Sequence, residues 1–472
     1  MIARPSAFLP REVADAVGGA LLQEGSRPLL GVATDTKDAL TDHLFVALVG
    51  ARFDAHDFLQ DALHAGASGL LVSDAGYSRV GVGDVDTTLV VVPDTLRALG
   101  DLARYHKQKL GVPALALTGS NGKTTTKEMV AAIQAQARPC LKTQGNLNNL
   151  IGVPLTLLGL EAHHEVAVVE MGMNRPGEIA RYTELAEPVA GLVLNVGPAH
   201  IGELGSMEAV ANAKGELFKG LPARAVAVVN LDDPRVVGQA SAAGALQRTF
   251  GRDPSADVHL TSAAPRAQGG QDLVLHVDGR RMQAFLPLDG AHNALNAAGA
   301  VALATARPDL VPVELDAVAA GLSKVVIPGG RLAARGVGDL WVIDDGYNAN
   351  RASMEAALAT AAGIARARGG RLVALLGEMR ELGEFSEAEH ARVGEAAAAA
   401  GAVAVAAFGP GAGPIARAAQ GAGAPAHHEA EDDAALFAWA RERWRPGDVV
   451  LVKGSRGIRM ERFIRLIEGE VD

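Results

Sequence analysis

The sequence predicts an α/β protein of three domains, and three observations support this fold class. The chain has 472 residues, which is too long for one compact core and suggests about three domains. In the middle and in the last third, short apolar runs alternate with segments of helical periodicity. Strands that are apolar throughout and separated by helices indicate parallel sheets covered on both faces.

The N-terminal domain is expected at residues 1–94, as a small mixed α/β unit with strands at 44–48 and 69–72 and a helix at 58–65. Residues 1–10 lack the apolar core of a signal peptide. The longest apolar stretch, 396–408, is shorter than the roughly 20 residues that span a bilayer. We therefore expect a cytoplasmic protein with no membrane span.

The central domain is expected at residues 95–327, with strands at 114–117, 166–169, 191–194 and 225–229. A glycine-containing loop follows the first of these strands; its residues are Gly119, Ser120, Asn121, Gly122, Lys123, Thr124 and Thr125. In such a loop, backbone N–H groups converge on phosphate oxygens, Lys123 adds a positive charge, and Thr124 offers a hydroxyl to Mg²⁺. Apolar positions Met129, Val130, Ile133 and Ala137 predict a helix directly after the loop. We therefore expect ATP to bind to a parallel sheet of the P-loop ATPase type.

Two further side chains are candidates for the same site, because the carboxyl ends of parallel strands meet at one edge of a sheet. Glu170 closes the strand at 166–169 and could bind Mg²⁺, which prefers oxygen ligands. His200 follows the next strand and can approach the same crevice, but a lone histidine is equally often structural.

The C-terminal domain is expected at residues 328–472, after turn residues at 327–330. Its strands are expected at 341–343, 372–376, 402–408 and 449–452, with helices between them, as in a Rossmann-like doubly wound sheet. Before this boundary, runs at 273–277 and 282–286 surround Asp278 and Gly279 and predict a small β-hairpin appendage on the central domain.

Composition excludes several other classes of protein. The net charge of -10 disfavours a nucleic-acid partner, which would require a basic face. A single cysteine, Cys140, cannot form an intrachain disulfide. The chain is 49% hydrophobic and 21% charged, which is typical of a globular protein and not of a disordered one.

Taken together, these residues resemble the Mur ligases, ATP-dependent amide-forming enzymes of peptidoglycan precursor synthesis. The segments that carry the resemblance lie in all three expected domains, at 35–37, 44–58, 143–154 (containing GNLNN), 170–178 (EMGMNRPGE), 197–205, 344–350 (DDGYNAN) and 453–456 (KGSR). The chain is most similar to the members that add D-Ala-D-Ala to UDP-MurNAc-tripeptide. The resemblance implies that the γ-phosphoryl group of ATP passes to the tripeptide carboxylate, and that the dipeptide amine attacks the acyl phosphate.

The resemblance also implies roles for individual residues. Two Mg²⁺ ions would be held by Thr124, Glu170, His200 and Lys214, the last as a carbamate formed with CO2. ATP would also contact Asn293, Asn296, Arg331, Asp345, Tyr347 and Asn350. The catalytic set would be Lys123, Glu170, His200, Lys214 and Arg331. The substrates would contact Thr34, Asp35, Thr36, Lys37, Asp54, His56, Asn146, Asn148, Asn149, Lys453, Ser455 and Arg456. We expect a monomer whose C-terminal domain binds the D-Ala-D-Ala acceptor.

Two alternatives remain open at this point. The first is another ligase of the same superfamily, which would catalyse the same type of reaction on a different substrate. Examples are a folylpolyglutamate synthase and the Mur enzyme that adds diaminopimelate or lysine. The DDGYNAN and GNLNN segments argue against both of these examples. A P-loop nucleotide switch would turn over ATP without any acceptor, and would leave the second sheet domain unexplained.

Overall fold

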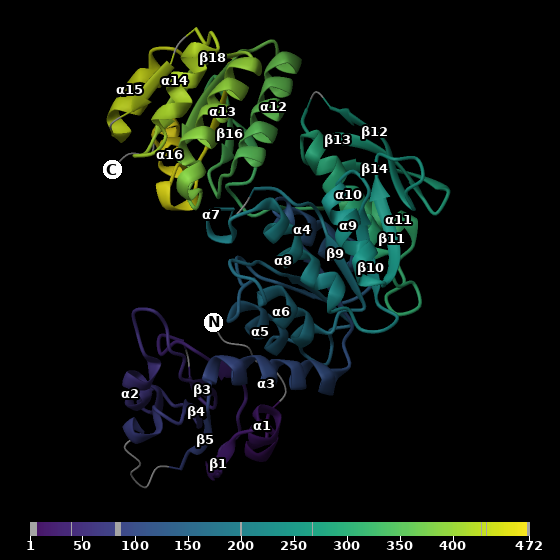
Figure 1. Cartoon of the computed structure of the whole chain (residues 1–472), viewed down its shortest axis with the longest axis vertical. Coiled ribbons are helices and arrows are strands. Elements are labelled where there is room, and N and C mark those ends of the chain that lie inside the picture. The colour runs from purple at the N-terminus through teal and green to yellow at the C-terminus, as the bar shows by residue number, and fades with distance from the viewer. Residues whose placement is uncertain are drawn as a thin grey trace.

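The computed structural model describes residues 7–38, 40–80, 86–198, 201–266, 268–425, 427–430 and 432–469. Within these ranges the strands form three separate sheets, of five, nine and six strands in chain order. Figure 1 shows three bodies along the longest axis, with the N-terminal sheet at the bottom and the C-terminal sheet at the top left. The predicted three-domain α/β fold is confirmed. No helix in the described ranges is long and apolar enough to cross a membrane.

The N-terminal sheet has the order β1-β5-β4-β3-β2, with β2 to β5 parallel and β1 antiparallel at the edge. Its elements are α1 (Pro10–Val17), β1 (Ala20–Gln23), β2 (Val32–Ala33), β3 (Leu44–Val46), η1 (Ala55–Phe58), α2 (Leu59–His64), β4 (Gly69–Ser73), η2 (Tyr77–Arg79) and β5 (Thr88–Val92). The two predicted strands and the predicted helix of this domain are present. The prediction lacks α1, β1, β2 and β5. With four and two residues, β1 and β2 are too short to show a period.

Helix α3 (Thr95–Leu110) connects the N-terminal sheet to the central one. The carboxylate of Asp94 starts this helix by accepting hydrogen bonds from the backbone N–H groups of its first turn. The apolar residues of α3 belong to one continuous core that also includes residues of α1 and of two central helices, α5 (Gly152–Leu158) and α6 (Glu178–Ala186). The same helix is therefore packed against both domains.

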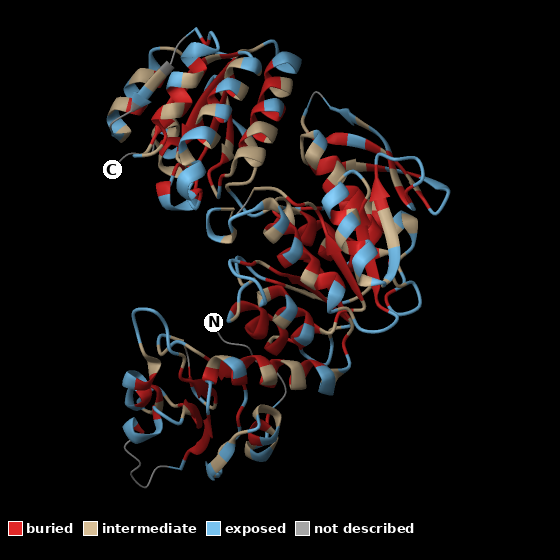
Figure 2. Cartoon of the chain, viewed as in Figure 1, coloured by how far each residue is buried: buried red, intermediate tan, exposed pale blue. Residues whose placement is uncertain are grey.

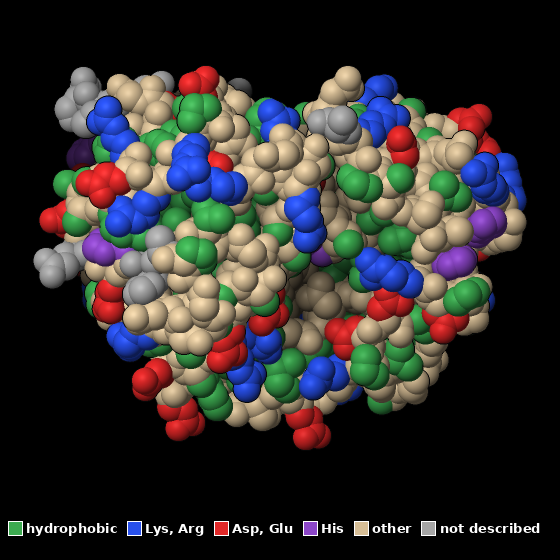
Figure 3. Space-filling view, turned by 90° about the horizontal axis from the view of Figure 1, so that it is seen from above, with side chains coloured by type: hydrophobic (Ala, Val, Ile, Leu, Met, Phe, Trp, Pro, Cys, Tyr) green, Lys and Arg blue, Asp and Glu red, His purple; other side chains and the backbone are tan. Residues whose placement is uncertain are grey.

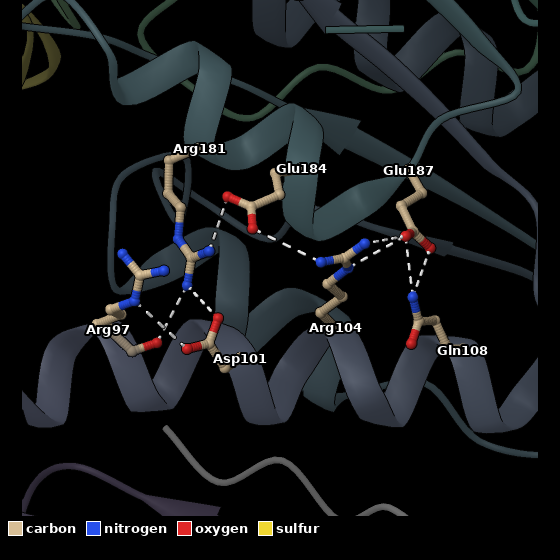
Figure 4. A network of polar contacts seen from close by, with 7 residues as sticks. All are labelled: Arg97, Asp101, Arg104, Gln108, Arg181, Glu184 and Glu187. Atoms are coloured by element: carbon tan, nitrogen blue, oxygen red, sulfur yellow. Dashed lines mark hydrogen bonds and ion pairs between the residues drawn. The ribbon is translucent and has the colours of Figure 1, made fainter. Parts of the chain in front are cut away.

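A polar network on α3 strengthens its contact with α6 (Figure 4). Arg181 Nη2 donates to Asp101 Oδ1 over 2.6 Å, and Arg104 Nη2 donates to Glu187 Oε1 over 2.6 Å. Arg104 of α3 faces Glu184 and Glu187, and Arg181 of α6 faces Asp101, whereas Arg97 pairs with Asp101 of its own helix. This charge pattern fixes how α3 lies along the central domain.

The central sheet has the order β14-β13-β12-β11-β10-β9-β6-β8-β7, parallel from β7 to β12 and antiparallel from β12 to β14. Its strands are β6 (Ala114–Thr118), β7 (Cys140–Lys142), β8 (Val166–Glu170), β9 (Ala190–Val193), β10 (Val226–Asn230), β11 (Leu246–Gly251), β12 (Val258–Pro265), β13 (Gln271–Val277) and β14 (Arg280–Leu286). The predicted hairpin is present as β13 and β14. The hairpin belongs to the central sheet, because β13 pairs with β12.

Helices cover both faces of the central sheet, and β6, β8, β9 and β10 are buried throughout (Figure 2). The strands β11 to β14 carry exposed residues. Besides α5 and α6, they are α4 (Lys123–Gln134), α7 (Ile201–Leu204), α8 (Met207–Lys219), α9 (Pro234–Ala243), α10 (Ala291–Ala304) and α11 (Leu315–Ser323). One face packs on α4, α10 and α11, and the other on α5, α6, α8 and α9. Helix α4 follows the glycine loop as predicted, but it ends at Gln134, so Ala137 lies beyond it.

The C-terminal sheet has the order β15-β16-β20-β17-β18-β19, parallel except for β15. Its elements are β15 (Ala333–Val337), β16 (Leu340–Asp345), α12 (Arg351–Arg368), β17 (Leu372–Gly377), η3 (Gly383–Phe385), α13 (Ser386–Ala399), β18 (Ala402–Phe408), α14 (Gly413–Gly421), β19 (His427–Ala430), α15 (Asp433–Arg441), β20 (Val449–Lys453), η4 (Arg456–Ile458) and α16 (Glu461–Glu468). Helices α12 to α14 cover one face, and α15 and α16 cover the other. All four predicted strands are present in a doubly wound sheet.

Candidate active site

A cavity of about 640 Å³ lies between the central and C-terminal domains, at the carboxyl ends of β6, β8 and β9. Seen from above, the surface is hollowed between the two upper parts of the molecule (Figure 3). The predicted site residues that line the cavity are Ser120, Asn121, Gly122, Lys123, Thr124, Thr125, Asn146, Asn148, Asn149, Glu170, Asn293, Asn296, Arg331, Asp345, Tyr347, Asn350 and Lys453. Residues from three distant parts of the sequence therefore meet in one place.

The glycine loop between β6 and α4 has the form expected of a phosphate-binding loop. Gly122 has φ +80°, and a Cβ added there would lie 2.7 Å from Oδ1 of Asn296, so both backbone and space require glycine. The ammonium of Lys123 donates to the backbone carbonyl of Gly119 over 2.7 Å. Burial lowers the pKa of Lys123, and the charge of Arg331 lowers it further, whereas Glu170 raises it.

Asn195, at the end of β9, holds this loop in position. Its Oδ1 accepts from the backbone N–H of Asn121 over 2.9 Å, and its Nδ2 donates to the carbonyl of Asn121 over 3.1 Å. Next to it, Ser120 Oγ accepts from Gly197 N over 2.8 Å and donates to Gly197 O over 3.0 Å. These hydrogen bonds fix the loop to the segment that follows β9.

Glu170 lies buried at the end of β8, with 1% of its surface exposed. Thr124 Oγ1 donates to its Oε1 over 3.2 Å, and Asn148 Nδ2 donates to the same oxygen over 2.8 Å. The second oxygen, Oε2, is buried and accepts no hydrogen bond from a described residue. A buried carboxylate oxygen without a donor, beside a threonine hydroxyl, fits the oxygen ligands of Mg²⁺.

Lys214, on α8, is 2% exposed, and no described residue accepts a hydrogen bond from its ammonium. Burial lowers its pKa well below the ordinary value, and the charge of Lys123 lowers it further. Because no described carboxylate pairs with it, burial favours the neutral amine form of Lys214. Lys214 is not among the residues that line the cavity.

His200 lies outside the described residues, so its predicted role stays a prediction. Among the residues that the structure describes, no group of three His, Cys, Asp or Glu side chains could hold a metal ion. The predicted magnesium set does not conflict with this finding, because it combines a threonine, a glutamate and a carbamate with His200.

The C-terminal domain places side chains over the glycine loop. Asn350 Nδ2 donates to Asn121 Oδ1 over 2.7 Å, across 229 positions of sequence. The guanidinium of Arg331 stacks on the ring of Tyr347, 3.8 Å from its centroid. These side chains and the loop line the same cavity. A nucleotide whose phosphates are held by the loop would extend into this cavity.

Asp345 and Lys453 form a buried ion pair below these residues, with 2.6 Å between Oδ2 and Nζ. Burial raises the pKa of Asp345, and the Lys453 ammonium opposes this effect. Lys453 also donates to the carbonyl of Asn348 over 2.9 Å. The pair anchors the ends of β16 and β20 at the cavity. Ser455 is buried nearby and accepts a hydrogen bond from Arg380 N, whereas Arg456 pairs with Glu461.

Helix α10 brings a chain of amides to the loop. Asn296 Nδ2 donates to Asn293 Oδ1 over 3.3 Å, and Asn293 Nδ2 donates to the carbonyl of Asp289 over 2.8 Å. Both asparagines are buried, and Asn296 packs against Gly122. The adjacent His292 also lines the cavity. Burial lowers its pKa to about 4, and Lys453 contributes to this shift.

The predicted substrate residues of the N-terminal domain lie away from this cavity. Asp54 Oδ1 accepts from Nδ1 of His56 over 2.6 Å, and Arg79 donates to its other oxygen over 2.8 Å. His56 is 2% exposed, and its Nε2 accepts from the backbone N–H of Ser73. Thr34, Thr36 and Lys37 lie just after β2, and Asp35 Oδ1 accepts from the backbone N–H of Lys37.

Comparison with known proteins agrees with this geometry. Residues 117–304 match the model of the Mur ligase middle domain, and residues 330–456 match that of the Mur ligase glutamate ligase domain. The UDP-N-acetylmuramoyl-tripeptide--D-alanyl-D-alanine ligase of Escherichia coli strain K12 is 39% identical over 458 residues, 95% of each chain. The chain belongs to the Mur ligase family.

Solved Mur ligase structures show the same arrangement of all three domains. A crystal structure of MurF from Acinetobacter baumannii has a TM-score of 0.89 and 30% identity, covering 99% of this chain and 100% of that one. MurF from Thermotoga maritima, in complex with ADP, has a TM-score of 0.81 and 27% identity, covering 93% and 97%.

Several residues of this Mur ligase site, His292 among them, lie outside the sequence prediction. Asn195 could have been found by the rule that identified Glu170, because it too follows a strand at the carboxyl edge. Lys127 is fully buried beneath Glu170 and lies one helical turn after Lys123. Its sequence position suggests an ordinary helix lysine, and only its burial reveals a role.

Proposed function

We propose that this Mur ligase joins D-alanyl-D-alanine to UDP-N-acetylmuramoyl-tripeptide and converts ATP to ADP and phosphate. The observation that carries the proposal is the cavity in which the phosphate-binding loop meets the C-terminal domain, through Asn121 and Asn350. Relatives that cover nearly the whole chain bear the name of this activity. The glycine loop of a simple nucleotide switch would have no need of a second sheet domain over it.

ATP would bind with its phosphates on the loop from Gly119 to Thr125. Arg331, Asp345, Tyr347 and Asn350 would close over the nucleotide from the C-terminal domain, and Asn293 and Asn296 would contact it from α10. The stacking of Arg331 on Tyr347 supports this arrangement, because it keeps a cation at the cavity. The ADP complex of the Thermotoga maritima relative agrees with nucleotide use.

Two magnesium ions would be held by Thr124, Glu170, His200 and a carbamate on Lys214. When bound, magnesium neutralises negative charge on the phosphate oxygens. The fit rests on Oε2 of Glu170, which accepts no hydrogen bond from a described residue, and on the hydrogen bond from Thr124 to Oε1 of the same carboxylate. Carbamylation requires a neutral amine, and the burial of Lys214 without a described counter-ion supports it.

The protein's own residues would promote both steps of the reaction. First, an oxygen of the tripeptide carboxylate bonds to the γ-phosphorus of ATP, and the bond from that phosphorus to ADP breaks. Lys123 and Arg331 would stabilise the charge on the transferring oxygens. Then the neutral amine nitrogen of the dipeptide bonds to the acyl carbon, the bond from that carbon to the phosphate oxygen breaks, and the nitrogen loses a second proton to give the amide. With a reference pKa of about 8, that amine is mostly protonated at neutral pH, so proton loss must precede attack.

The three domains would divide the substrates, with boundaries at 94/95 and 327/328. Residues 1–94 would bind the UDP group through the loops of Thr34 to Lys37 and Asp54. His56 is buried, so it would act by orienting Asp54. Asn146, Asn148 and Asn149 would line the path of the tripeptide, and Lys453, Ser455 and Arg456 would serve the acceptor. The reaction would take place in the cytoplasm, and the protein would act as a monomer.

The test is product formation with a panel of acceptors. The protein is incubated with ATP, Mg²⁺, UDP-MurNAc-tripeptide and, in separate reactions, D-Ala-D-Ala, L-glutamate, L-lysine or diaminopimelate. Mass spectrometry should detect the pentapeptide only with D-Ala-D-Ala. Tripeptide labelled with ¹⁸O in its terminal carboxylate should transfer one label to the released phosphate, as an acyl phosphate requires. A product with another acceptor instead would assign a different ligase activity.

A further inference from the structure

The buried lysine below the predicted magnesium site has no role in the function described so far. Lys127 is 0% exposed, and its ammonium lies 3.9 Å from Oε2 of Glu170, the oxygen that accepts no hydrogen bond from a described residue. A buried ammonium is costly unless it is paired, and Glu128 Oε1 lies 3.0 Å from it. The pairing keeps the charge of Lys127 in the interior beside Glu170.

A second link joins the same two side chains through Thr143. Lys127 Nζ donates to the carbonyl of Thr143 over 2.7 Å, and the hydroxyl of Thr143 accepts from the backbone N–H of Glu170 over 3.0 Å. Thr143 is fully buried. The ammonium therefore fixes both the backbone at the end of β8 and the surroundings of the carboxylate.

The charges in this region form a line from the surface to the site. The ammonium of Lys142, which is one-third exposed, pairs with Oε2 of Glu128; Glu128 pairs with Lys127; and Lys127 lies beside Glu170. Two cations and two carboxylates alternate, so the line as a whole has no net charge. Of the described residues, Lys127 alone forms ion pairs with both Glu128 and Glu170.

We propose that Lys127 is a positioning residue for magnesium binding, which holds Glu170 with Oε2 free to face the metal. The inference rests on the proposed function, because it takes Glu170 as a magnesium ligand. An ammonium at 3.9 Å stabilises the carboxylate charge without a short hydrogen bond that would occupy Oε2. Outer partners that orient a ligand commonly change metal affinity tenfold or more.

The experiment measures metal binding directly, with Mn²⁺ as the probe. Electron paramagnetic resonance titrates Mn²⁺ into the full-length protein with saturating ADP, and calorimetry measures ADP binding in EDTA. Lys127→Met keeps the length of the side chain and removes its charge. The expected result is about a tenfold loss of Mn²⁺ affinity, with ADP affinity in EDTA within twofold of the wild type. Lys142→Met removes a charge on the other side of Glu128 and should leave Mn²⁺ affinity within twofold.

A double variant separates positioning from stability. Removing one member of a buried pair is destabilising, whereas removing both is often nearly neutral. Lys127→Met with Glu128→Gln should therefore fold well and still lose Mn²⁺ affinity about tenfold. Wild-type Mn²⁺ affinity in this double variant would overturn the proposal. Glu170→Gln separates the failure of the Lys127 proposal from the failure of the magnesium assignment. If Glu170→Gln loses Mn²⁺ affinity while the Lys127 variants do not, only the role of Lys127 fails. If Glu170→Gln also binds Mn²⁺ normally, the magnesium assignment fails with it.

Discussion

The carboxamide of Asn350 connects the C-terminal domain to the phosphate-binding loop, by donating to Oδ1 of Asn121 over 2.7 Å. The same side chain starts α12, because its Oδ1 accepts from the backbone N–H of Ser353 over 2.9 Å. The first helix of the C-terminal domain is therefore tied to the loop at its N-terminus. A nucleotide bound on the loop would be in contact with both domains at this point.

Replacing Asn350 by serine should separate these two roles. Serine is a good N-cap but is too short to reach Asn121, so the helix start is kept and the contact between domains is lost. A neutral hydrogen bond contributes about 1 kcal/mol, so the KM for ATP should rise about three- to tenfold with little change in the melting temperature. Asn350→Ala loses both bonds and should also lower stability by about 1 kcal/mol. Steady-state kinetics and thermal unfolding check both variants; an unchanged KM in Asn350→Ser would contradict this account of the contact.

Gly122→Ala should damage the loop itself. The positive φ disfavours any side chain, and the new Cβ would lie 2.7 Å from Oδ1 of Asn296. ADP affinity, measured by calorimetry, should fall at least about tenfold. Gly363→Ala is the matched control, because Gly363 lies inside α12 with nothing within 4 Å of the added methyl. That control should gain about 0.5 to 1 kcal/mol of stability and bind ADP normally. Normal binding by Gly122→Ala would show that the loop does not hold the phosphates.

The stability of the protein should depend on pH through His292. Burial lowers its pKa from 6.5 to about 4. Between these two values the unfolded chain binds the proton and the folded chain does not, so stability falls as pH decreases from 6.5 toward 4. This single group accounts for at most about 3 kcal/mol of the loss. In His292→Asn, denaturant unfolding at pH 7 and pH 4.5 should show a smaller difference than in the wild type. An equal difference would exclude His292 as the cause.

Lys214 should carry a carbamate in the active protein. Incubation with ¹³C-bicarbonate should give a carbamate signal by NMR, absent from Lys214→Ala. That variant should lose at least about a hundredfold in kcat, since a metal ligand contributes several kcal/mol. Activity should also fall in carbonate-free buffer and return when bicarbonate is added. Full activity of the wild type without any ¹³C signal would contradict the carbamate.

Local patterns predicted much of the fold and part of the site. The glycine loop, the strand ending at Glu170 and four of the six strands of the C-terminal sheet are each visible in a few consecutive residues, because apolar periodicity and strand-end position decide them. The two edge strands β15 and β19 lack a continuous apolar run, and the prediction lacks them. The burial of Lys127 and Lys214 could not be predicted in this way. Both look like exposed helix lysines in the sequence, and only tertiary packing places them in the interior. The contact between Asn121 and Asn350 likewise depends on how two domains meet.

The most direct test of the central claim is phosphate release from ATP and Mg²⁺, with UDP-MurNAc-tripeptide and D-Ala-D-Ala omitted singly and together. A ligase that forms an acyl phosphate for an amine acceptor should release phosphate at its full rate only when both substrates are present. Release that is indifferent to D-Ala-D-Ala would contradict the proposed ligase and favour a nucleotide switch or another acceptor.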